Sequence, residues 1–573
     1  MSLSVVAVHQ AVVESLTASG GRFELEQVTV GERLYRAYRH APASLEEFFS
    51  NAASSFADRG LLVQEGRRYT YGELFTAARR LAGSLRDEFG VGTGDRVGIV
   101  MRNRAEYLVA LFAAARIGAV AVLFNSRGTA TELGAATDDV PCTVIIADKG
   151  RAERLTEGDC AAPLVVVGGH GSSGTADATD YADLVAPGRR DAAAAVVDRD
   201  APAWVLFTSG TSGRSKGAVL TQRNVCNMIT NLDYMRESAR ELRSRLSGVP
   251  AEVLLERTPP LVSLLVYPLF HVSGLSVMAG ALLKGGHMVA LRRWDPERAA
   301  RDIVENKVTA LSAPPLVLHD LLALPDAAGV LRGLVQIGAG GQATPVNLAR
   351  RMREAAPGAA QSGGWGMTET VATVCAAAGP LADARPGAAG RTMPVMDVRA
   401  VDDAGRVLPP GTPGELQVRG VLVMQGYYGR PEATATAFDG EWYRTGDVGH
   451  VDEDGFVYVI DRLTDMVISG GENIYCAEVE KALTATDDFV EVAVFGVPDV
   501  RTGERTVAAV RPRDGLVLAP EDIRSAVGRV LADYKVPSEV VFLPDPFPRT
   551  ATGKVEKAKL RAAFLADRGK RRD

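Results

Sequence analysis

The sequence is poor in several features that mark particular classes of protein. Its 573 residues include only five cysteines, an odd number, and these form no Cys-x-x-Cys pair and have no histidine at metal-ligand spacing beside them. A chain of this length does not depend on disulfides for stability, so the pattern indicates reduced thiols in a cytoplasmic protein. The cysteines are Cys142, Cys160, Cys226, Cys375 and Cys476.

A basic excess is missing, and so is a long apolar run. The formal net charge is −6, which gives no general footprint for nucleic acid. The first ten residues lack the basic region and the small-residue cleavage site of a secretory signal. The most apolar segment, 107–124, is interrupted by Arg116 and Gly118 and is too short to cross a bilayer of about 30 Å. We therefore expect no nucleic-acid partner and no membrane span.

The length and the pattern of the chain predict an α/β protein with at least two domains. Helical and strand patterns alternate from 70 to 123 and again from 261 to a helix that begins at Pro345, which is typical of sheets with helices on their faces. Short strands between 395 and 459 indicate a small β-rich subdomain. We predict a large N-terminal domain, 1–463, of two α/β sheet subdomains and this β-rich subdomain. A small mobile α+β domain, 464–573, follows.

Two segments carry weaker signals. Residues up to about Ala43 have mixed polarity, and we expect them to lie over the surface of the following domain. Segment 233–260 is rich in charge and predicts a helix with a solvated face, or alternatively a partner-binding or lid element.

The stretch from Trp204 to Thr221 predicts a loop that binds phosphate. Two apolar strands flank a run of hydroxyls, glycines and cations, which together can direct many hydrogen-bond donors at one anion. It is not the usual P-loop, because Lys216 stands between Ser215 and Gly217. Taken alone, the run is also compatible with a flexible Gly/Ser surface loop. Its candidate ligands are Thr208, Ser209, Gly210, Thr211, Ser212, Gly213 and Lys216.

Two later motifs offer partners for the rest of a nucleotide. In Gly364-Trp-Gly-Met-Thr-Glu-Thr370, the indole of Trp365 is a flat surface for a purine, and Thr368 and Glu369 suit phosphate and Mg²⁺. In Tyr443-Arg-Thr-Gly-Asp447, the carboxylate of Asp447 can accept both ribose hydroxyls. Taken singly, the first motif is more often a helix start with a buried Trp and the second ordinary turn chemistry.

The order of the motifs changes this interpretation. After these three come Asp461-Arg-Leu-Thr-Asp-Met-Val-Ile-Ser-Gly-Gly-Glu-Asn-Ile-Tyr475 and Pro548-Arg-Thr-Ala-Thr-Gly-Lys554. The succession resembles the acyl-CoA synthetase branch of the adenylate-forming superfamily, which also contains luciferases and peptide-synthetase adenylation domains. The resemblance spans essentially the whole chain.

The resemblance implies a role for each motif. Segment 209–216 would hold the β- and γ-phosphates of ATP, while Trp365-Gly366 and Gly340-Gly341 would enclose the adenine. Thr368 and Glu369 would meet the α-phosphate and Mg²⁺. Asp447 and Arg462 would bind the ribose, and Lys554 would reach the α-phosphate and the acid. His271 would stand beside the acyl pocket, although a lone His is more often structural. Gly470 and Gly471 would line the path of coenzyme A.

The implied activity is that of an ATP- and Mg²⁺-dependent carboxylate–CoA ligase that forms an acyl-adenylate and releases AMP and pyrophosphate. The position two residues after Arg462 is usually Asp or Lys in the family and is Thr464 here. This departure leaves open an enzyme that passes its adenylate to a carrier protein, an amine or another acceptor. An inactive nucleotide-binding relative is disfavoured by the intact motif residues. The small and apolar residues expected around the acid fit an aryl or a medium-to-long acyl group equally well, and no pattern specifies an oligomeric state.

Overall fold

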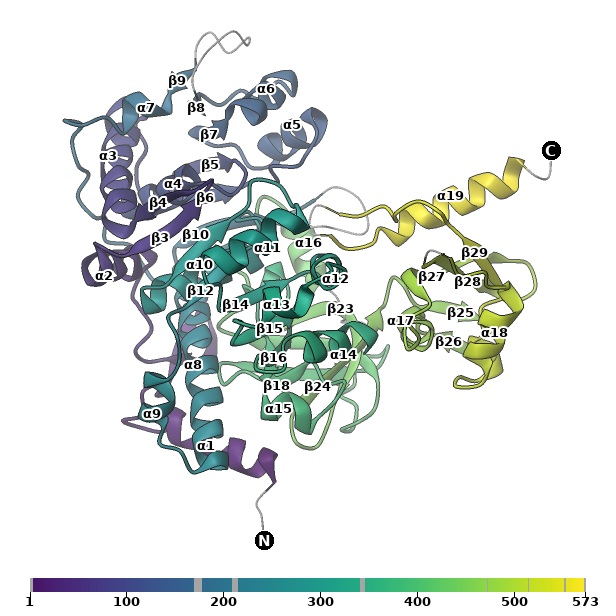
Figure 1. Ribbon diagram of the computed structural model, residues 1–573. Helices are drawn as coiled ribbons and strands as arrows, with labels where there is room; N and C mark the ends of the chain where they lie inside the picture. The colour runs from purple at the N-terminus through teal and green to yellow at the C-terminus, as the bar shows by residue number, and fades with distance from the viewer. Residues whose placement is uncertain are drawn as a thin grey trace.

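The computed structural model describes residues 4–168, 178–208, 215–340, 346–470, 472–513, 515–550 and 553–570 (Figure 1). The larger body contains two extended sheets, and a third, smaller sheet near the C-terminus stands to its right in the view of Figure 1. The predicted fold class is confirmed. The exact boundary at residue 464 stays a prediction.

The first sheet has eight strands, whose spatial order begins at β21 and ends at β9. In that order they are β21 (Gly426–Tyr427), β11 (Gly217–Thr221), β10 (Pro202–Phe207), β6 (Val120–Leu123), β5 (Arg96–Val100), β7 (Val144–Asp148), β8 (Leu164–Val167) and β9 (Thr179–Asp180). From β10 to β9 all neighbours run parallel, so their carboxyl ends lie along one edge. Ligands of open α/β sheets bind at such edges.

The second sheet joins an α/β part to the β-rich segment. Its main path is β19 (Met396–Val401), β20 (Gly414–Gly420), β23 (Trp442–Val451), β24 (Phe456–Arg462), β18 (Gly390–Thr392), β17 (Cys375–Ala378), β16 (Ala360–Trp365), β15 (Gln336–Ala339), β14 (Ala310–Ala313), β12 (Val262–Leu265), β13 (His287–Ala290), β3 (Gly60–Gln64) and β4 (Arg67–Thr70), and β22 (Phe438–Asp439) pairs with β23. The antiparallel pairing of β18 with β24 makes the β-rich segment continuous with the parallel strands.

The helices of the larger body pack on these sheets or on one another (Figure 1). They are α1 (Val5–Thr17), α2 (Leu45–Phe56), α3 (Tyr71–Phe89), α4 (Ala105–Arg116), α5 (Ala130–Asp139), α6 (Lys149–Glu157), α7 (Tyr181–Leu184), α8 (Gln222–Ser247), α9 (Ala251–Glu256), α10 (Val272–Lys284), α11 (Pro296–Glu305), α12 (Pro315–Leu322), α13 (Ala327–Leu331), α14 (Val346–Ala355), α15 (Pro380–Ala384) and α16 (Pro431–Ala437). The start of α3 follows directly from its sequence, because Thr70 and Glu73 form a reciprocal capping box.

The C-terminal sheet comprises five strands. They are β26 (Glu472–Ile474), β25 (Val467–Ser469), β28 (Gly503–Pro512), β27 (Phe489–Asp499) and β29 (Glu539–Phe542), with helices α17 (Cys476–Leu483), α18 (Pro520–Gly528) and α19 (Lys557–Lys570). A salt bridge between Arg350 of α14 and Asp487, 2.6 Å long, joins this unit to the larger body on their exposed surfaces.

The two peripheral segments lie on the larger body and form a helix, respectively, as expected, and each packs more closely than its polarity alone indicated. The N-terminal segment packs inward, because α1 and the hairpin of β1 (Leu25–Val30) and β2 (Arg33–Tyr38) lie against α8. The charged segment forms the predicted helix as the second half of α8, and one of its charged side chains is buried. In α8, Glu237 is 7% exposed and meets both Arg22 and Arg240, so ion pairing rather than solvation accounts for part of its charge.

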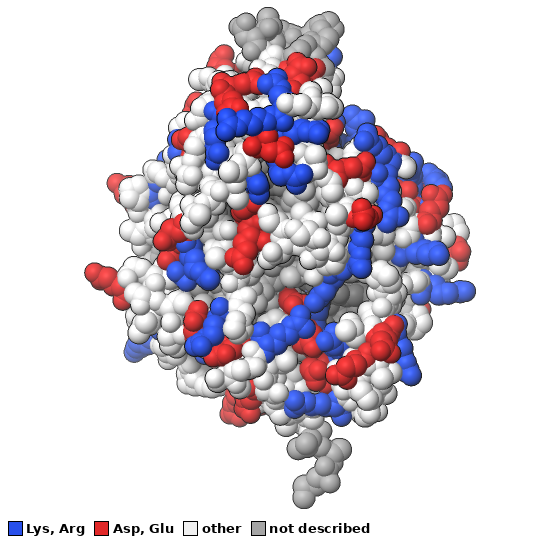
Figure 2. All heavy atoms as spheres, turned by 90° about the vertical axis from the view of Figure 1, so that its left-hand side faces the viewer, with Lys and Arg blue, Asp and Glu red and all other residues white. Residues whose placement is uncertain are grey.

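The five cysteines all fall in the described part of the chain and form no disulfide. No helix within the described ranges has the length and hydropathy needed to span a bilayer. Lys and Arg are interspersed with Asp and Glu over the face shown in Figure 2, with neither sign covering it.

His9 fastens α1 to the larger body in its neutral form. Its Nε2 faces the Ser238 hydroxyl at 3.3 Å and its Nδ1 faces Arg391 at 3.2 Å. Because Arg391 can only donate, Nδ1 accepts and Nε2 carries the proton. Burial, with a further contribution from Arg391, lowers the pKa of His9 to about 4.

The pKa of His9 predicts a loss of stability in mild acid. The unfolded chain binds a proton near pH 6.5 and the folded chain only near pH 4, so stability is full above pH 6.5 and falls as the pH decreases between these values. We expect about 2 kcal/mol of this site's contribution to be lost between pH 7 and pH 5. Thermal unfolding across this range should be less pH-dependent in His9→Gln. Equal slopes in wild type and variant would contradict the assignment.

Candidate active site

The carboxylate of Asp447 is held by two motif residues at once. Asp447 on β23 lies directly across the antiparallel ladder from Arg462 on β24, whose Nε is 3.2 Å from Asp447 Oδ1. Trp365, the last residue of β16, donates its indole N–H to Asp447 Oδ2 at 2.7 Å. Asp447 is 4% exposed. Each carboxylate oxygen therefore has one fixed partner and retains acceptor capacity for a ligand hydroxyl.

Glu369 and Lys216 are linked through a tyrosine that the motif analysis missed. Glu369 lies in the 3₁₀ turn Thr368–Thr370 and accepts a hydrogen bond from the Tyr427 hydroxyl at 2.9 Å. The Lys216 ammonium lies 4.7 Å from the centroid of the same ring. Burial and the charge of Glu369 raise the pKa of Tyr427, which keeps its hydroxyl protonated as a donor. The available sequence signal was a pair of aromatic residues, Tyr427-Tyr428, between two glycines.

Lys554 reaches this group from the C-terminal unit. Burial lowers the pKa of its ammonium and Arg462 lowers it further, while Asp447 and Glu369 act in the opposite direction. The geometry agrees, because a β-carbon on Gly553, the residue before Lys554, would lie 3.5 Å from Pro314 of the larger body. The motif residues of the larger body and the lysine from the other end of the chain converge on one region.

The turn that carries Lys554 is tied to the C-terminal sheet. The Thr550 N–H donates to the Lys554 carbonyl at 2.8 Å, and the Lys554 N–H donates to Thr550 Oγ1 at 3.1 Å. Ahead of this turn, Arg549 pairs with Glu491 of β27, which also accepts from Arg511 Nε at 2.7 Å. The Glu491 side chain is 4% exposed, so removing one partner would leave charge uncompensated in a buried place.

His271 has a structural function at the start of α10. Its Nδ1 accepts a hydrogen bond from the Ser273 N–H at 3.2 Å, which caps the helix. Its ring stacks on Tyr267 with centroids 6.4 Å apart and planes 21° apart. Burial, and secondarily the charge of Lys554, lower the pKa of His271 to about 4, so the ring is neutral at physiological pH.

Glycines fit close contacts around the same region. The Tyr267 hydroxyl donates to the Gly340 carbonyl at 3.0 Å, and a β-carbon at position 340 would lie 3.0 Å from that hydroxyl. A β-carbon on Gly366 would lie 1.5 Å from the Ala372 carbonyl oxygen, so this position excludes any side chain. Gly366 thus shapes the turn that presents Thr368 and Glu369.

Several residues predicted to bind ATP or CoA lie outside the described part of the chain, and two others make backbone hydrogen bonds within the protein. Ser209, Gly210, Thr211, Ser212, Gly213, Gly341 and Gly471 lie outside the described residues. Thr208 ends the strand before the predicted phosphate loop, where its N–H donates to the Lys216 carbonyl at 2.9 Å. Gly470 occupies the turn between β25 and β26 with φ +62°, and its N–H donates to the Thr502 carbonyl.

Comparison with family models decides the family. A model described as AMP-binding enzyme matches residues 49–428, and one described as AMP-binding enzyme C-terminal domain matches residues 478–554. The chain belongs to the AMP-binding enzyme family. The predicted superfamily is thus confirmed, and the second match covers the part of the chain that carries Lys554.

Curated relatives of this AMP-binding enzyme are acid–CoA ligases. A feruloyl-CoA synthase of Amycolatopsis sp. is 35% identical over 501 residues, covering 87% of this chain and 94% of the relative. A long-chain-fatty-acid–CoA ligase of Mycobacterium tuberculosis is 31% identical over 514 residues, with coverage of 87% and 94%. A 2-succinylbenzoate–CoA ligase of Geobacillus kaustophilus is 33% identical over 506 residues, with the same coverage. These relatives confirm the predicted activity class, an AMP-forming acid–thiol ligase.

Solved structures with the same fold include nucleotide complexes. ATP-bound MatB from Rhodopseudomonas palustris is 28% identical, with a TM-score of 0.78, and the match covers 91% of this chain and 99% of that one. The o-succinylbenzoate CoA synthetase of Bacillus subtilis, in complex with its acyl-adenylate intermediate, is 28% identical with a TM-score of 0.74 and coverage of 90% and 97%.

The bond between Trp365 and Asp447 predicts an effect on nucleotide recognition. In Trp365→Phe the aromatic face remains but the hydrogen bond to the carboxylate is lost, a bond of a type worth about 1.5–3 kcal/mol. We expect the KM for ATP to rise roughly tenfold with a smaller change in kcat, and selectivity for ATP over 2′-deoxy-ATP to fall. Steady-state kinetics with both nucleotides measure this. An unchanged ratio between the two nucleotides would show that the indole does not orient Asp447.

Proposed function

We propose that this enzyme activates an aromatic carboxylic acid in two half-reactions, first as an acyl-adenylate and then as a CoA thioester. The observation that carries the proposal is the buried Asp447 carboxylate, held by Arg462 at 3.2 Å and Trp365 at 2.7 Å, with the Gly553-Lys554 turn against Pro314 of the same body. A carboxylate is a poor electrophile. Its attack on the α-phosphorus of ATP releases pyrophosphate and gives a mixed anhydride that a thiol can displace.

In the first half-reaction Lys554 interacts with the α-phosphate and the carboxylate of the acid. Negative charge accumulates on the phosphate oxygens in this step, and a preorganised ammonium in a water-poor site stabilises it strongly. Burial, and secondarily Arg462, lower the pKa of Lys554, so an anion beside its ammonium would stabilise the charged form. The incoming phosphate and carboxylate are anions of this kind. Asp447 meanwhile accepts the ribose hydroxyls, oriented by Trp365 and Arg462.

The donor set also fits Mg²⁺ as a partner of ATP. The described residues contain no group of three or more His, Cys, Asp or Glu side chains arranged for a metal. Mg²⁺ bound with nucleotides commonly uses one or two carboxylates together with the phosphates, and Glu369 supplies one. The ion would offset phosphate charge there. The Tyr427 hydroxyl holds the orientation of the Glu369 carboxylate.

The second half-reaction requires Lys554 to leave and a thiol to approach. The backbone turn Arg462–Met466 connects β24 to the C-terminal sheet, and the N–H groups of Asp465 and Met466 both donate to the Arg462 carbonyl. Rotation at this turn would carry the Gly470 turn toward the adenylate. Thr464 is exposed within this connection. If the rotation is slow, the alternative is an enzyme that transfers its adenylate to a carrier-protein thiol or an amine.

The surroundings of His271 favour an aromatic acid. The ring of His271 is half-buried and stacks on the buried ring of Tyr267, so one flat face is available, and the Gly340 backbone bonded to Tyr267 has no side chain. A planar ring packs well against a flat aromatic face. Feruloyl and 2-succinylbenzoyl groups, named in two of the relatives, are aromatic, whereas the mycobacterial relative is named for fatty acids.

Lys554→Ala should separate the two half-reactions. We expect acid-dependent pyrophosphate release to fall about 10²- to 10³-fold, because one preorganised donor is lost where charge develops. Thioester formation from supplied acyl-adenylate should change little, since Lys554 has left the site by then. Lys559→Ala is a matched control, because Lys559 is 66% exposed and pairs only locally with Glu556. An equal loss in both half-reactions would contradict the assignment.

The acid class is tested by pyrophosphate release over a panel of aryl, fatty and short-chain acids, each with and without CoA. We expect turnover with aryl acids that is completed only when CoA is present. Turnover with fatty acids alone would overturn the aromatic proposal. Release that is insensitive to CoA would favour another acceptor.

A further inference from the structure

The turn that presents Glu369 contains an unfavourable backbone conformation. After the 3₁₀ turn Thr368–Thr370, Val371 has φ +47° and Ala372 has φ +85°. Steric repulsion disfavours this left-handed region for residues with a side chain, above all for a β-branched residue such as valine. No other pair of consecutive non-glycine residues in the described part of the chain has positive φ. Strain of this kind persists only where the surrounding structure holds it, and it gathers at functional sites.

One hydroxyl joins the two ends of this strained turn. Thr370 Oγ1 accepts the Met367 N–H at 3.1 Å, and the same oxygen lies 3.2 Å from the Met367 carbonyl oxygen and 3.4 Å from that of Ala372. A hydroxyl has one proton, so it donates to one of these two carbonyls at a time. Thr370 is 0% exposed, so water does not replace these bonds. Loss of the hydroxyl would remove a contact at both ends of the turn.

The residues on either side of the strained pair are fixed by other contacts. The Ala372 N–H donates to the Met367 carbonyl at 3.1 Å, and the Val374 N–H donates to the Trp365 carbonyl at 2.9 Å. The Val371 side chain is 0% exposed and belongs to the main hydrophobic core. These contacts hold the turn close to the end of β16, and the Thr370 hydroxyl is the side-chain group that bridges it.

Glu369 takes its direction from this turn. Its carbonyl accepts the Met424 N–H at 2.8 Å, and its carboxylate accepts the Tyr427 hydroxyl at 2.9 Å. Both partners belong to one neighbouring segment and hold Glu369 from that side. Along its own chain, Glu369 is followed directly by Thr370 and the strained pair. A relaxed turn would therefore shift the Glu369 carboxylate relative to ATP.

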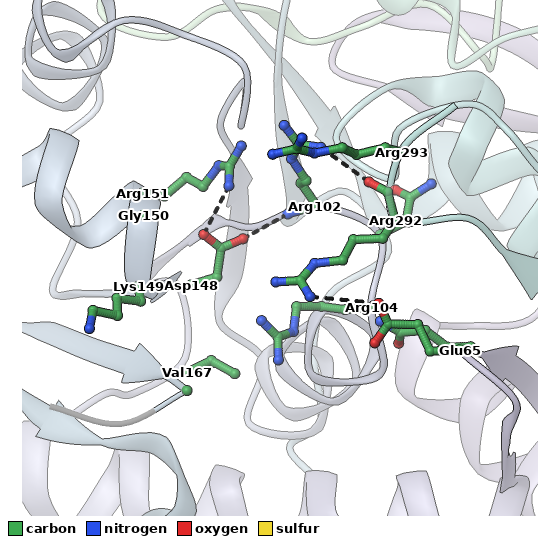
Figure 3. Close-up of a pocket in the computed structure, with 13 residues that line it drawn as sticks. Glu65, Arg102, Arg104, Asp148, Lys149, Gly150, Arg151, Val167, Arg292 and Arg293 are labelled. Atoms are coloured by element: carbon green, nitrogen blue, oxygen red, sulfur yellow. Dashed lines mark hydrogen bonds and ion pairs between the residues drawn. The ribbon is translucent and has the colours of Figure 1, made fainter. Parts of the chain in front are cut away.

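Thr370 has no direct route to a ligand. It is fully buried, and no residue of 365–374 lines the cleft of about 600 Å³ between the carboxyl ends of β5 and β7 and the segment after β13 (Figure 3). Any effect of its hydroxyl on nucleotide binding thus passes through its neighbours in the turn.

We propose that Thr370 is a positioning residue, whose hydroxyl holds the strained Val371-Ala372 turn and so aims the Glu369 carboxylate at the complex of Mg²⁺ with ATP. The first part of this proposal concerns the conformation of the chain alone. The second part rests on the proposed function, which assigns Glu369 to Mg²⁺. Without the hydroxyl the strained peptide units relax, because a left-handed valine is maintained only by its surroundings.

The test uses three variants of the full-length protein. Thr370→Val removes the hydroxyl at nearly constant volume, and Thr370→Ser keeps it. Thr309→Val is a matched control, because the buried Thr309 hydroxyl also joins two backbone groups, accepting the Val262 N–H at 2.9 Å and donating to the Pro260 carbonyl at 3.0 Å. It does so at the amino end of β14. Thermal unfolding reports folding, and Thr370→Ala replaces Thr370→Val should the latter unfold.

Hydrogen exchange of the ligand-free variants tests the turn itself. Mass spectrometry of peptides that cover 366–374 follows the amides, among them that of Met367, which donates to the hydroxyl. We expect exchange roughly tenfold faster in Thr370→Val than in the wild type, as for the loss of one hydrogen bond, and wild-type exchange in Thr370→Ser and Thr309→Val. Exchange in Thr370→Val equal to that of the wild type would overturn the proposal and leave the proposed function untouched.

A double-mutant cycle on the dissociation constant of Mg²⁺·ATP tests the action through Glu369, and it needs neither the acid nor CoA. We expect roughly tenfold weaker binding in Thr370→Val and little further loss when this change is added to Glu369→Gln, because both remove the same interaction. A merely structural role gives losses that multiply, and that result would overturn the positioning of Glu369. Faster exchange of the turn together with an unchanged Mg²⁺·ATP affinity in Glu369→Gln would contradict the proposed role of Glu369 with Mg²⁺ and leave Thr370 as the residue that holds the turn.

Discussion

The buried carboxylate of Asp447 is the point on which the nucleotide-binding half of the molecule depends. A carboxylate with so little access to water needs partners, and it finds them in the guanidinium of Arg462 and the indole of Trp365. Each partner ends a different strand of the second sheet, β24 and β16. The ion pair and the hydrogen bond therefore connect the β-rich segment to the parallel strands at the place where a ribose would bind. A shift of one strand relative to the other would move the Asp447 carboxylate and weaken ribose binding.

Lys554, near the other end of the chain, is also a buried charge that needs partners. An ammonium buried beside a guanidinium is unfavourable by itself, and the lowered pKa of Lys554 expresses that. Its position near Arg462 is tolerable because Asp447 and Glu369 are close and because an anionic substrate completes the set. In the proposed mechanism, this balance would couple occupancy of the nucleotide site to the position of the C-terminal unit. It would give a physical reason for the adenylate to form in one domain arrangement and to be consumed in another.

Much of the fold and the identity of the motif residues were predictable from the sequence. The capping box of Thr70 and Glu73 depends only on residues close in sequence. The five motifs each add evidence for the family when they occur in order. The contacts among the motifs were not predictable, because Trp365 and Asp447 are 82 residues apart and meet only through strand order. Tyr427 was missed since an aromatic pair between glycines looks like an ordinary turn. The inward-packed N-terminal hairpin shows that short strands of mixed polarity give too weak a pattern to distinguish packing from surface coverage.

The anchoring of the Lys554 turn through Glu491 has a mechanical consequence. Arg549, five residues before Lys554, and Arg511 both pair with one buried carboxylate of β27, which fixes the start of this segment to the C-terminal sheet. In the proposed mechanism Lys554 would therefore leave the site together with the whole C-terminal sheet. The frequency of that rotation would then limit turnover.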